Sequence, residues 1–185
     1  MKRVFIIHGW GGSPEANWFP WMKKELEKRK ISIEVLAMPN TDNPKMEEWL
    51  DFMREKIGKI DEDIFLVGHS LGCIAILRYL ESLSEGEKVG GALLVAGFSR
   101  SINIPELENF FQTPLDYEKV KKSVRQIGAI NSDNDYYVPM EEGKILEEKL
   151  GAKLVVLHKA FHLNEGNGFF ELPTGLEELL KMINN

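Results

Sequence analysis

Ser70 lies in a pattern typical of a serine that attacks a carbonyl carbon. It stands between Gly68 and Gly72 in the spacing Gly-x-Ser-x-Gly. The residues 64–67 are all apolar and predict a buried strand, and the apolar residues from Leu71 onward recur at helical spacing, so Ser70 falls where a strand turns into a helix. Glycines permit such a tight turn, which exposes the serine hydroxyl at the carboxyl edge of a sheet. A serine that merely caps the helix is the alternative, so the partners of Ser70 must decide.

A serine hydroxyl needs a base to take its proton, and histidine suits this role because its unperturbed pKa is about 6.5. Of the four histidines, His162 is the predicted base, because it lies in the loop after the last expected strand and can reach Ser70 from there. His8 and His69 flank glycines in two other loops and are interpreted as hydrogen-bonding loop residues. His158 closes a strand and is interpreted as structural or exposed.

The acid that orients the base should follow the fifth expected strand, where two aspartates stand. Both Asp133 and Asp135 are credible turn formers, because an aspartate can hydrogen-bond its own backbone. Asp135 comes shortly before Val138 and Pro139, and Pro139 can open the next helix. We therefore predict Asp135 as the acid and keep Asp133 as the alternative, with a turn or capping role. The resulting chain order of serine, aspartate and histidine is the one expected for a triad on an open α/β sheet.

The glycine-rich loop at residues 8–13, His-Gly-Trp-Gly-Gly-Ser, could be mistaken for a phosphate-binding loop. It lacks the Lys-Ser/Thr ending of a P-loop, and it has neither the G-x-G-x-x-G spacing nor a suitably placed ribose acid, so no cofactor is predicted. Its better use is an oxyanion hole, in which the backbone N–H groups of Trp10 and Leu71 hold the charge that develops on a carbonyl oxygen. The four histidines and the single cysteine show no tetrahedral spacing, so no metal site is predicted either.

Apolar strand patterns alternate with helical patterns along the whole chain. The expected strands are Val4–His8, Ile31–Ala37, Ile64–His69, Val89–Ala96, Val124–Asn131 and Lys153–His158. The expected helices are Pro20–Lys30, Pro44–Ile57, Leu71–Leu83, Tyr117–Ser123, Pro139–Leu150 and Leu176–Ile183. This alternation predicts βαβ units, hence one six-stranded parallel sheet with helices on both faces, in a single domain at 1–185. Ligands of such sheets bind beyond the carboxyl ends of the strands, where the candidate residues stand.

The long connection Phe98–Asp116 is the one segment without a clear element. It contains proline, and its length is compatible with a short cap or a substrate wall. Its aromatic residues Phe98, Phe110 and Phe111 fit local packing equally well.

Composition excludes several classes of function. The chain of 185 residues is 43% hydrophobic and 28% charged, as in a soluble globular domain. A net charge of −6 repels phosphate backbones and anionic membranes, so we expect neither nucleic acid nor a membrane as partner. No apolar run reaches the length of a membrane span, and the start of the sequence does not resemble a signal peptide. The single cysteine, Cys73, is interpreted as a core residue and suits the reducing cytoplasm, which is the expected location.

Several further stretches resemble one family of compact α/β-hydrolases, the serine hydrolases of the retinoblastoma-binding protein 9 and YdeN type. The stretches that carry the resemblance are Trp18–Leu26, Met38-Pro39 followed by Pro44 and Trp49, Gly68–Gly72, and Asp135–Pro139 with His162. The similarity extends from Val4 to the last helix. In this family the triad acid stands in the pattern D-x-x-[VL]-P, which supports Asp135 over Asp133. The first loop, HGWGG, is closer to hydrolases in general than to the mammalian member of the family.

The residues and the resemblance together predict a minimal α/β-hydrolase: a three-layer α/β/α sandwich with strand order 2-1-3-4-5-6 and little or no cap. We expect hydrolysis of a small ester, or as second choice an amide, through an acyl-enzyme on Ser70. His162 would act as base and then acid, and Asp135 would hold its tautomer. The sequence does not separate carboxylesterase, thioesterase and aminopeptidase-like activities, and it identifies no protein partner. A non-catalytic interaction module with the same fold is the alternative, because a fold does not prove a function.

Overall fold

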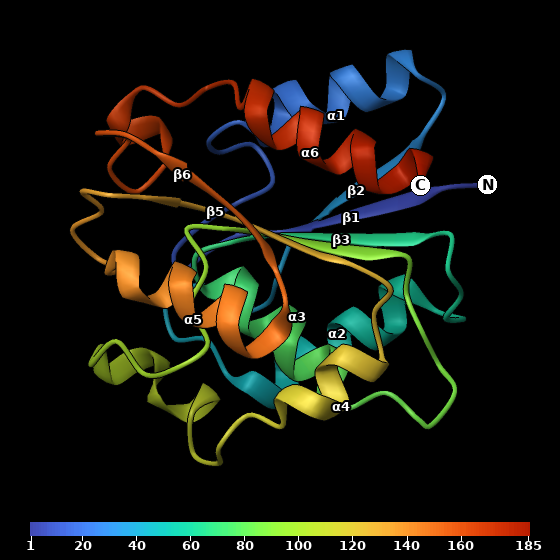
Figure 1. The fold of residues 1–185 in the computed structure, drawn as a ribbon, viewed down its shortest axis with the longest axis horizontal. Helices are drawn as coiled ribbons and strands as arrows, with labels where there is room; N and C mark the ends of the chain where they lie inside the picture. Colours follow the sequence, from blue (N-terminus) through green and yellow to red (C-terminus); the bar gives the residue numbers. More distant parts are fainter.

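Six parallel strands form one sheet through the middle of the molecule, in the order β2-β1-β3-β4-β5-β6 (Figure 1). The structure is a computed structural model that describes residues 1–185. The strands are β1 (Arg3–Ile7), β2 (Ser32–Leu36), β3 (Ile64–His69), β4 (Gly91–Val95), β5 (Ile127–Ser132) and β6 (Lys153–Leu157). Every neighbouring pair is parallel, which confirms the predicted sheet and its strand order.

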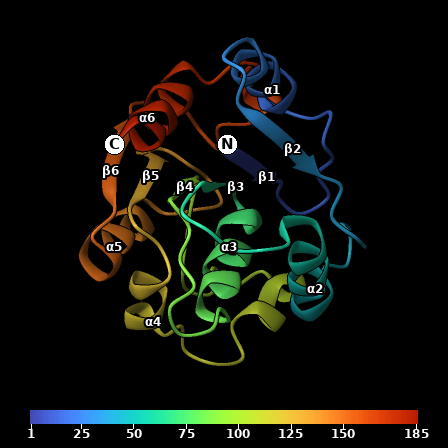
Figure 2. The ribbon, with the colours of Figure 1, turned by 90° about the vertical axis from the view of Figure 1, so that its right-hand side faces the viewer.

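Helices cover both faces of this sheet, as Figures 1 and 2 show. The helices are α1 (Phe19–Lys28), α2 (Met46–Ile57), α3 (Leu71–Glu81), α4 (Tyr117–Lys122), α5 (Met140–Leu150) and α6 (Pro173–Asn184). Helices α1 and α6 lie together on one face, and the other four cover the opposite face. The result is the predicted three-layer α/β/α sandwich.

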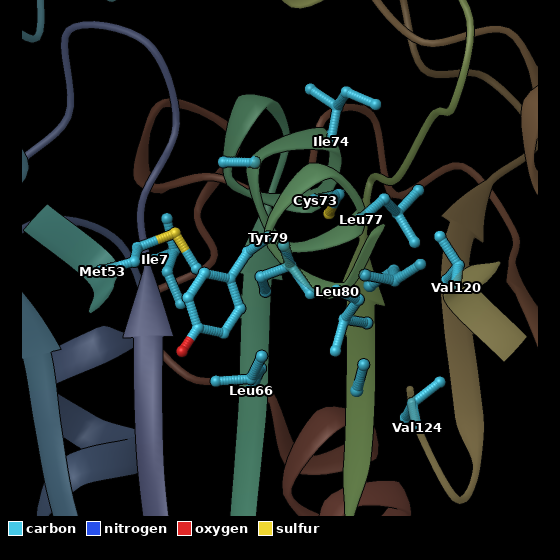
Figure 3. Close-up of a cluster of buried hydrophobic side chains, with 14 of the residues drawn as sticks. Ile7, Met53, Leu66, Cys73, Ile74, Leu77, Tyr79, Leu80, Val120 and Val124 are labelled. Atoms are coloured by element: carbon cyan, nitrogen blue, oxygen red, sulfur yellow. The ribbon is translucent and has the colours of Figure 1, made fainter. Parts of the chain in front are cut away.

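The core divides into two clusters because successive side chains of a strand point to opposite faces. In β1, Val4 and Ile6 pack with α1 and α6, whereas Phe5 and Ile7 join the larger cluster beneath α2 to α5. Helix α3 runs across the centre of that larger cluster, and Figure 3 shows its Leu77 and Leu80 packed toward the strands. Residues 71–80 of α3 are all buried, so the helix that follows Ser70 is held firmly in place.

The parallel register brings the ends of the central strands to one edge of the sheet. Ile7 at the end of β1 pairs with Gly68 of β3, and His69 pairs with Val95 at the end of β4. At the other side, Ser132 at the end of β5 pairs with Leu157 at the end of β6. The loops that carry the candidate residues therefore leave the sheet side by side.

Most element boundaries differ from the expectation by one or two residues, and the starts of β5 and α6 differ by three. Strands β4 and β5 begin at Gly91 and Ile127, because buried Val89 and Val124 meet only in an isolated bridge before the regular ladder starts. Helix α6 begins at Pro173 rather than Leu176, since the fixed φ of proline suits the first turn of a helix. The sequence pattern also gave no sign of the short 3-10 helix Pro105–Phe110 within the Phe98–Asp116 connection.

Candidate active site

Ser70 sits on a strained turn between β3 and α3. Its backbone has φ 53° and ψ −119°, a conformation that residues other than glycine rarely adopt. The neighbouring glycines make this turn possible. A Cβ on Gly72 would lie 2.1 Å from the carbonyl oxygen of Ile7, and a Cβ on Gly68 would lie 2.8 Å from the backbone nitrogen of Cys73. Any larger residue at either position would push β1 or α3 away and displace Ser70.

A chain of two hydrogen bonds connects Ser70 to a histidine and an aspartate. Nε2 of His162 lies 3.0 Å from Oγ of Ser70, and Nδ1 of His162 lies 2.8 Å from Oδ2 of Asp135. The side chains of His162 and Asp135 are only 7% and 1% exposed, so water hardly competes for these bonds. With Nδ1–H donating to the carboxylate, Nε2 is left free to accept the serine proton. The structure thus brings together the three side chains that the sequence singled out.

The two candidate aspartates after β5 have separate histidine partners. The second oxygen of Asp135 accepts the N–H groups of Tyr137 and Val138 at 2.8 and 3.0 Å, which fixes the carboxylate toward His162. Asp133 instead binds the ring of His158, which is 75% exposed. The hydrogen bond from the N–H of Lys159, followed by this contact with His158, lowers the pKa of Asp133. Asp133 therefore ties the end of β5 to the start of the loop after β6, and its carboxylate has no hydrogen bond to His162 or Ser70.

His69 supports the histidine loop from below. Its Nε2–H donates to the backbone carbonyl of His162 at 3.0 Å, and Trp18 donates its indole N–H to the next carbonyl, that of Leu163, at 3.1 Å. Burial, helped by the neighbouring His162 ring, lowers the pKa of His69 to about 3. A neutral imidazole is the form that burial favours here. The sequence motif contained His69 but did not indicate this contact.

His8 holds the end of β1 against the loop that follows β2. Its Nδ1–H donates to the carbonyl of Gly9 at 2.8 Å, and its Nε2 accepts the N–H of Met38 at 3.2 Å. Burial lowers the pKa of His8 as well. Both ring nitrogens are engaged within the fold, so His8 has no free nitrogen for a bound substrate.

The glycine-rich first loop packs directly against the serine. A Cβ on Gly9 would lie 3.2 Å from Cβ of Ser70. Trp10 lines the same cavity as Ser70, and its backbone N–H has no acceptor within the chain. Leu71 is the first residue of α3, so its N–H also lacks an intrahelical acceptor. The first loop and the start of α3 thus each hold a backbone N–H without an acceptor, and such donors are what an oxyanion hole requires.

A cavity of about 380 Å³ opens above Ser70. One wall is apolar and comes from the Phe98–Asp116 connection, through Ile102, Ile104 and Leu107. The polar part of the lining includes Asn17, Asn164 and Glu165. No lysine or arginine lines the cavity, and Glu165 is its only carboxylate. The space suits a small neutral group better than an anion.

The Phe98–Asp116 connection is anchored rather than free. Buried Arg78 of α3 donates to the carbonyl of Phe110 at 2.9 Å and also to that of Thr113. Asn109 accepts the N–H of Met46 at 2.7 Å and so ties the connection to the start of α2. Phe98 and Phe110 are fully buried, so they pack locally while the isoleucines and Leu107 form the cavity wall.

Three other features would indicate a different function: a metal site, a reactive thiol or a membrane-spanning helix. No group of three or more histidine, cysteine, aspartate or glutamate side chains is arranged to hold a metal ion. Burial raises the pKa of the thiol of Cys73, a residue of α3 whose side chain lies in the core (Figure 3). None of the helices has the length and apolar character needed to cross a membrane.

This chain is similar to known proteins over nearly its whole length. A family model described as "Serine hydrolase" matches residues 4–181. The hydrolase YdeN of Bacillus subtilis (strain 168) is 38% identical over 173 residues, which cover 93% of this chain and 91% of YdeN. The serine hydrolase RBBP9 of Rattus norvegicus is 28% identical over 184 residues, covering 96% and 95%. The crystal structure of the B. subtilis ydeN product superimposes over all of both chains with a TM-score of 0.96 and 36% identity. The chain therefore belongs to the serine hydrolase family and has the α/β-hydrolase fold.

Proposed function

We propose that this protein is an esterase that cleaves a small, neutral acyl ester through an acyl-enzyme on Ser70. The observation that carries the proposal is the buried chain of hydrogen bonds from Asp135 through His162 to Ser70, at 2.8 and 3.0 Å. A structural serine that only capped α3 would need no such partners, and the Ser70 side chain in fact caps nothing.

In the proposed reaction, Oγ of Ser70 attacks the ester carbonyl carbon while Nε2 of His162 takes the hydroxyl proton. The carbonyl oxygen becomes negative, and the N–H groups of Trp10 and Leu71 stabilise it. His162 then returns the proton to the departing alkoxide, which leaves as an alcohol. Water, deprotonated by the same histidine, attacks the acyl-enzyme and releases the carboxylic acid and free Ser70. Asp135 keeps Nδ1 protonated and stabilises the imidazolium throughout.

The cavity supports a limit on the size and charge of the acyl group of the substrate. A volume of about 380 Å³ is near the small end of ligand pockets, which span roughly 300 to 1,000 Å³. The apolar wall suits a short acyl chain, and the absence of a cationic lining residue disfavours a carboxylate on that chain. A cytoplasmic location is part of the proposal, because the single cysteine is buried and forms no disulfide.

A panel of p-nitrophenyl esters with acetyl, butyryl and octanoyl groups tests the proposal, with acyl anilides and thioesters of the same chains beside them. We expect the short esters to have the highest kcat/KM, and Ser70→Ala to lower it by roughly a thousandfold or more while remaining folded. Turnover of the thioesters or anilides but of no ester would contradict the esterase proposal, and turnover of none of these substrates would favour the non-catalytic interaction module. Equal turnover by Ser70→Ala would exclude Ser70 as nucleophile.

A further inference from the structure

The loop that carries His162 has an unusual backbone. Lys159, Phe161 and Leu163 have φ values of 52°, 50° and 55°, and they alternate with Ala160 and His162. None of the three is a glycine, so each left-handed residue is unfavourable by itself. A loop with three such residues in five positions needs external contacts to keep its shape.

Those contacts come from side chains, because the N–H groups of a backbone that alternates in this way cannot form the regular hydrogen bonds of a helix or a sheet. Four consecutive N–H groups of this loop donate to side-chain oxygens, three from the end of β5 and one from Asn167 further along the same connection. The bonds are Lys159 N–H to Asp133 Oδ1 (2.8 Å), Ala160 N–H to Ser132 Oγ (3.0 Å), Phe161 N–H to Asn134 Oδ1 (2.8 Å) and His162 N–H to Asn167 Oδ1 (3.2 Å). Three of the four acceptors follow one another directly at the end of β5. The loop after β5 thus holds the loop after β6.

Asn134 occupies the middle of this arrangement. Its Oδ1 accepts the N–H of Phe161 and also the hydroxyl of Ser132, at 2.9 Å. Asn134 therefore holds Phe161, and the next residue, Asp135, holds the next residue of the other loop, His162. These two adjacent contacts, Asn134 with Phe161 and Asp135 with His162, fix the position of the His162 ring relative to the Asp135 carboxylate.

We propose that Asn134 is a positioning residue for His162: by binding the N–H of Phe161, its Oδ1 keeps the imidazole in line between Asp135 and Ser70. This inference rests on the proposed function of the three residues. Asn134 is not among the residues that line the cavity, so its effect must pass through the loop. A purely local turn role, which asparagine often has, would affect stability and leave the ring in place.

Two substitutions at the same position separate these roles. Asn134→Leu removes the acceptor at similar size, whereas Asn134→Asp keeps an acceptor oxygen at that position. Gln126→Leu is the matched control, since it removes a side-chain bond to the carbonyl of Met182 (2.8 Å) at the opposite end of β5. For each protein we would measure kcat and KM for a short ester, the rate of fluorophosphonate labelling and the melting temperature. Long-range ¹H–¹⁵N NMR would report the His162 tautomer.

We expect Asn134→Leu to lower kcat and the labelling rate by about 10- to 100-fold with KM nearly unchanged, because small displacements of a catalytic group have costs of this size. Its NMR spectrum should show a mixture of His162 tautomers, whereas the parent and Asn134→Asp show Nδ1–H alone. Asn134→Asp should retain most of kcat, and Gln126→Leu should lower only the melting temperature.

Parent-like kcat and tautomer in folded Asn134→Leu would overturn the inference, as would an equal loss of kcat in Asn134→Asp. These results differ from a failure of the proposed function, in which the parent itself would neither label nor turn over ester. The NMR comparison decides about Asn134 even then, because the contact between His162 and Asp135 does not depend on turnover.

Discussion

One carboxylate oxygen of Asp135 is hydrogen-bonded to Nδ1 of His162, and the other accepts two backbone N–H groups. A single buried side chain therefore both closes its own turn and orients the imidazole. In Asp135→Asn the amide oxygen would keep the two backbone N–H groups, so the amide NH2 would face Nδ1 and favour the wrong tautomer. We expect kcat for a short ester to fall by about ten-thousandfold, with a melting temperature that shows the protein folded.

Asp133→Asn is the matched control for this prediction, since Asp133 contacts His158 and the N–H of Lys159 instead. It should change kcat by at most a modest factor and stability by about 1 kcal/mol or less. A dead Asp133→Asn beside an active Asp135→Asn would mean that the acid is assigned wrongly. Full activity in both variants would rule out the serine, histidine and aspartate mechanism.

Trp10 should act through its backbone, because its N–H is free while its indole binds the carbonyl of Asp42 at 3.0 Å. Trp10→Phe keeps the donor, and Trp10→Pro removes it. We expect Trp10→Pro to lower kcat by about 100-fold or more and Trp10→Phe to retain most of it. Ester turnover and melting curves of both variants check this. Equal activity in the two folded proteins would refute an oxyanion role for Trp10.

Leu107 should limit the length of the acyl chain, since it is buried and lines the cavity from the Phe98–Asp116 connection. Leu107→Ala enlarges the cavity, so the ratio of kcat/KM for octanoyl over acetyl esters should rise. The variant should also lose about 2 to 5 kcal/mol of stability. Leu115→Ala, a buried leucine of the same connection outside the cavity, should lose stability without a change in this ratio. A shift of equal size in both variants would argue against a specificity role.

Stability should fall in acid because His69 stays neutral in the folded protein. Its pKa is lowered from 6.5 to about 3 by burial, so below pH 6.5 the unfolded chain binds a proton that the folded chain does not. The stabilisation is complete above pH 6.5 and is lost progressively toward pH 3, by at most about 1.4 kcal/mol per pH unit for this group. His8, whose pKa is also lowered, acts in the same direction.

Urea unfolding of the parent and of His69→Gln at a series of pH values checks this dependence. Glutamine does not titrate and can still donate to the carbonyl of His162, so its curve should depend less on pH in this range. An identical slope in the two proteins would show that His69 is not the cause.

The sheet was predictable because each strand and helix has a local sequence pattern, an apolar run for a strand and a 3.6-residue periodicity for a helix. The strand order agreed with the prediction in full. Boundaries at Val124 and Pro173 were missed, since a buried valine resembles a strand residue even where no ladder forms.

The residues alone did not decide between Asp133 and Asp135, for a physical reason. Both follow the same strand, and each meets a histidine in the loop after β6, so the choice depends on the register between two loops. The contact between Asn134 and Phe161 was missed for the same reason, because it joins segments 27 residues apart that share no local pattern. The run of polar residues directly after β5 was the only signal in the sequence.

Covalent labelling shows whether Ser70 is the nucleophile. The protein would be incubated with a fluorophosphonate probe, digested and sequenced by mass spectrometry, with Ser70→Ala beside it. A nucleophilic Ser70 predicts one adduct per chain, located on Ser70, and no labelling of folded Ser70→Ala. An unlabelled parent protein, or an adduct on another residue that persists in Ser70→Ala, would contradict it.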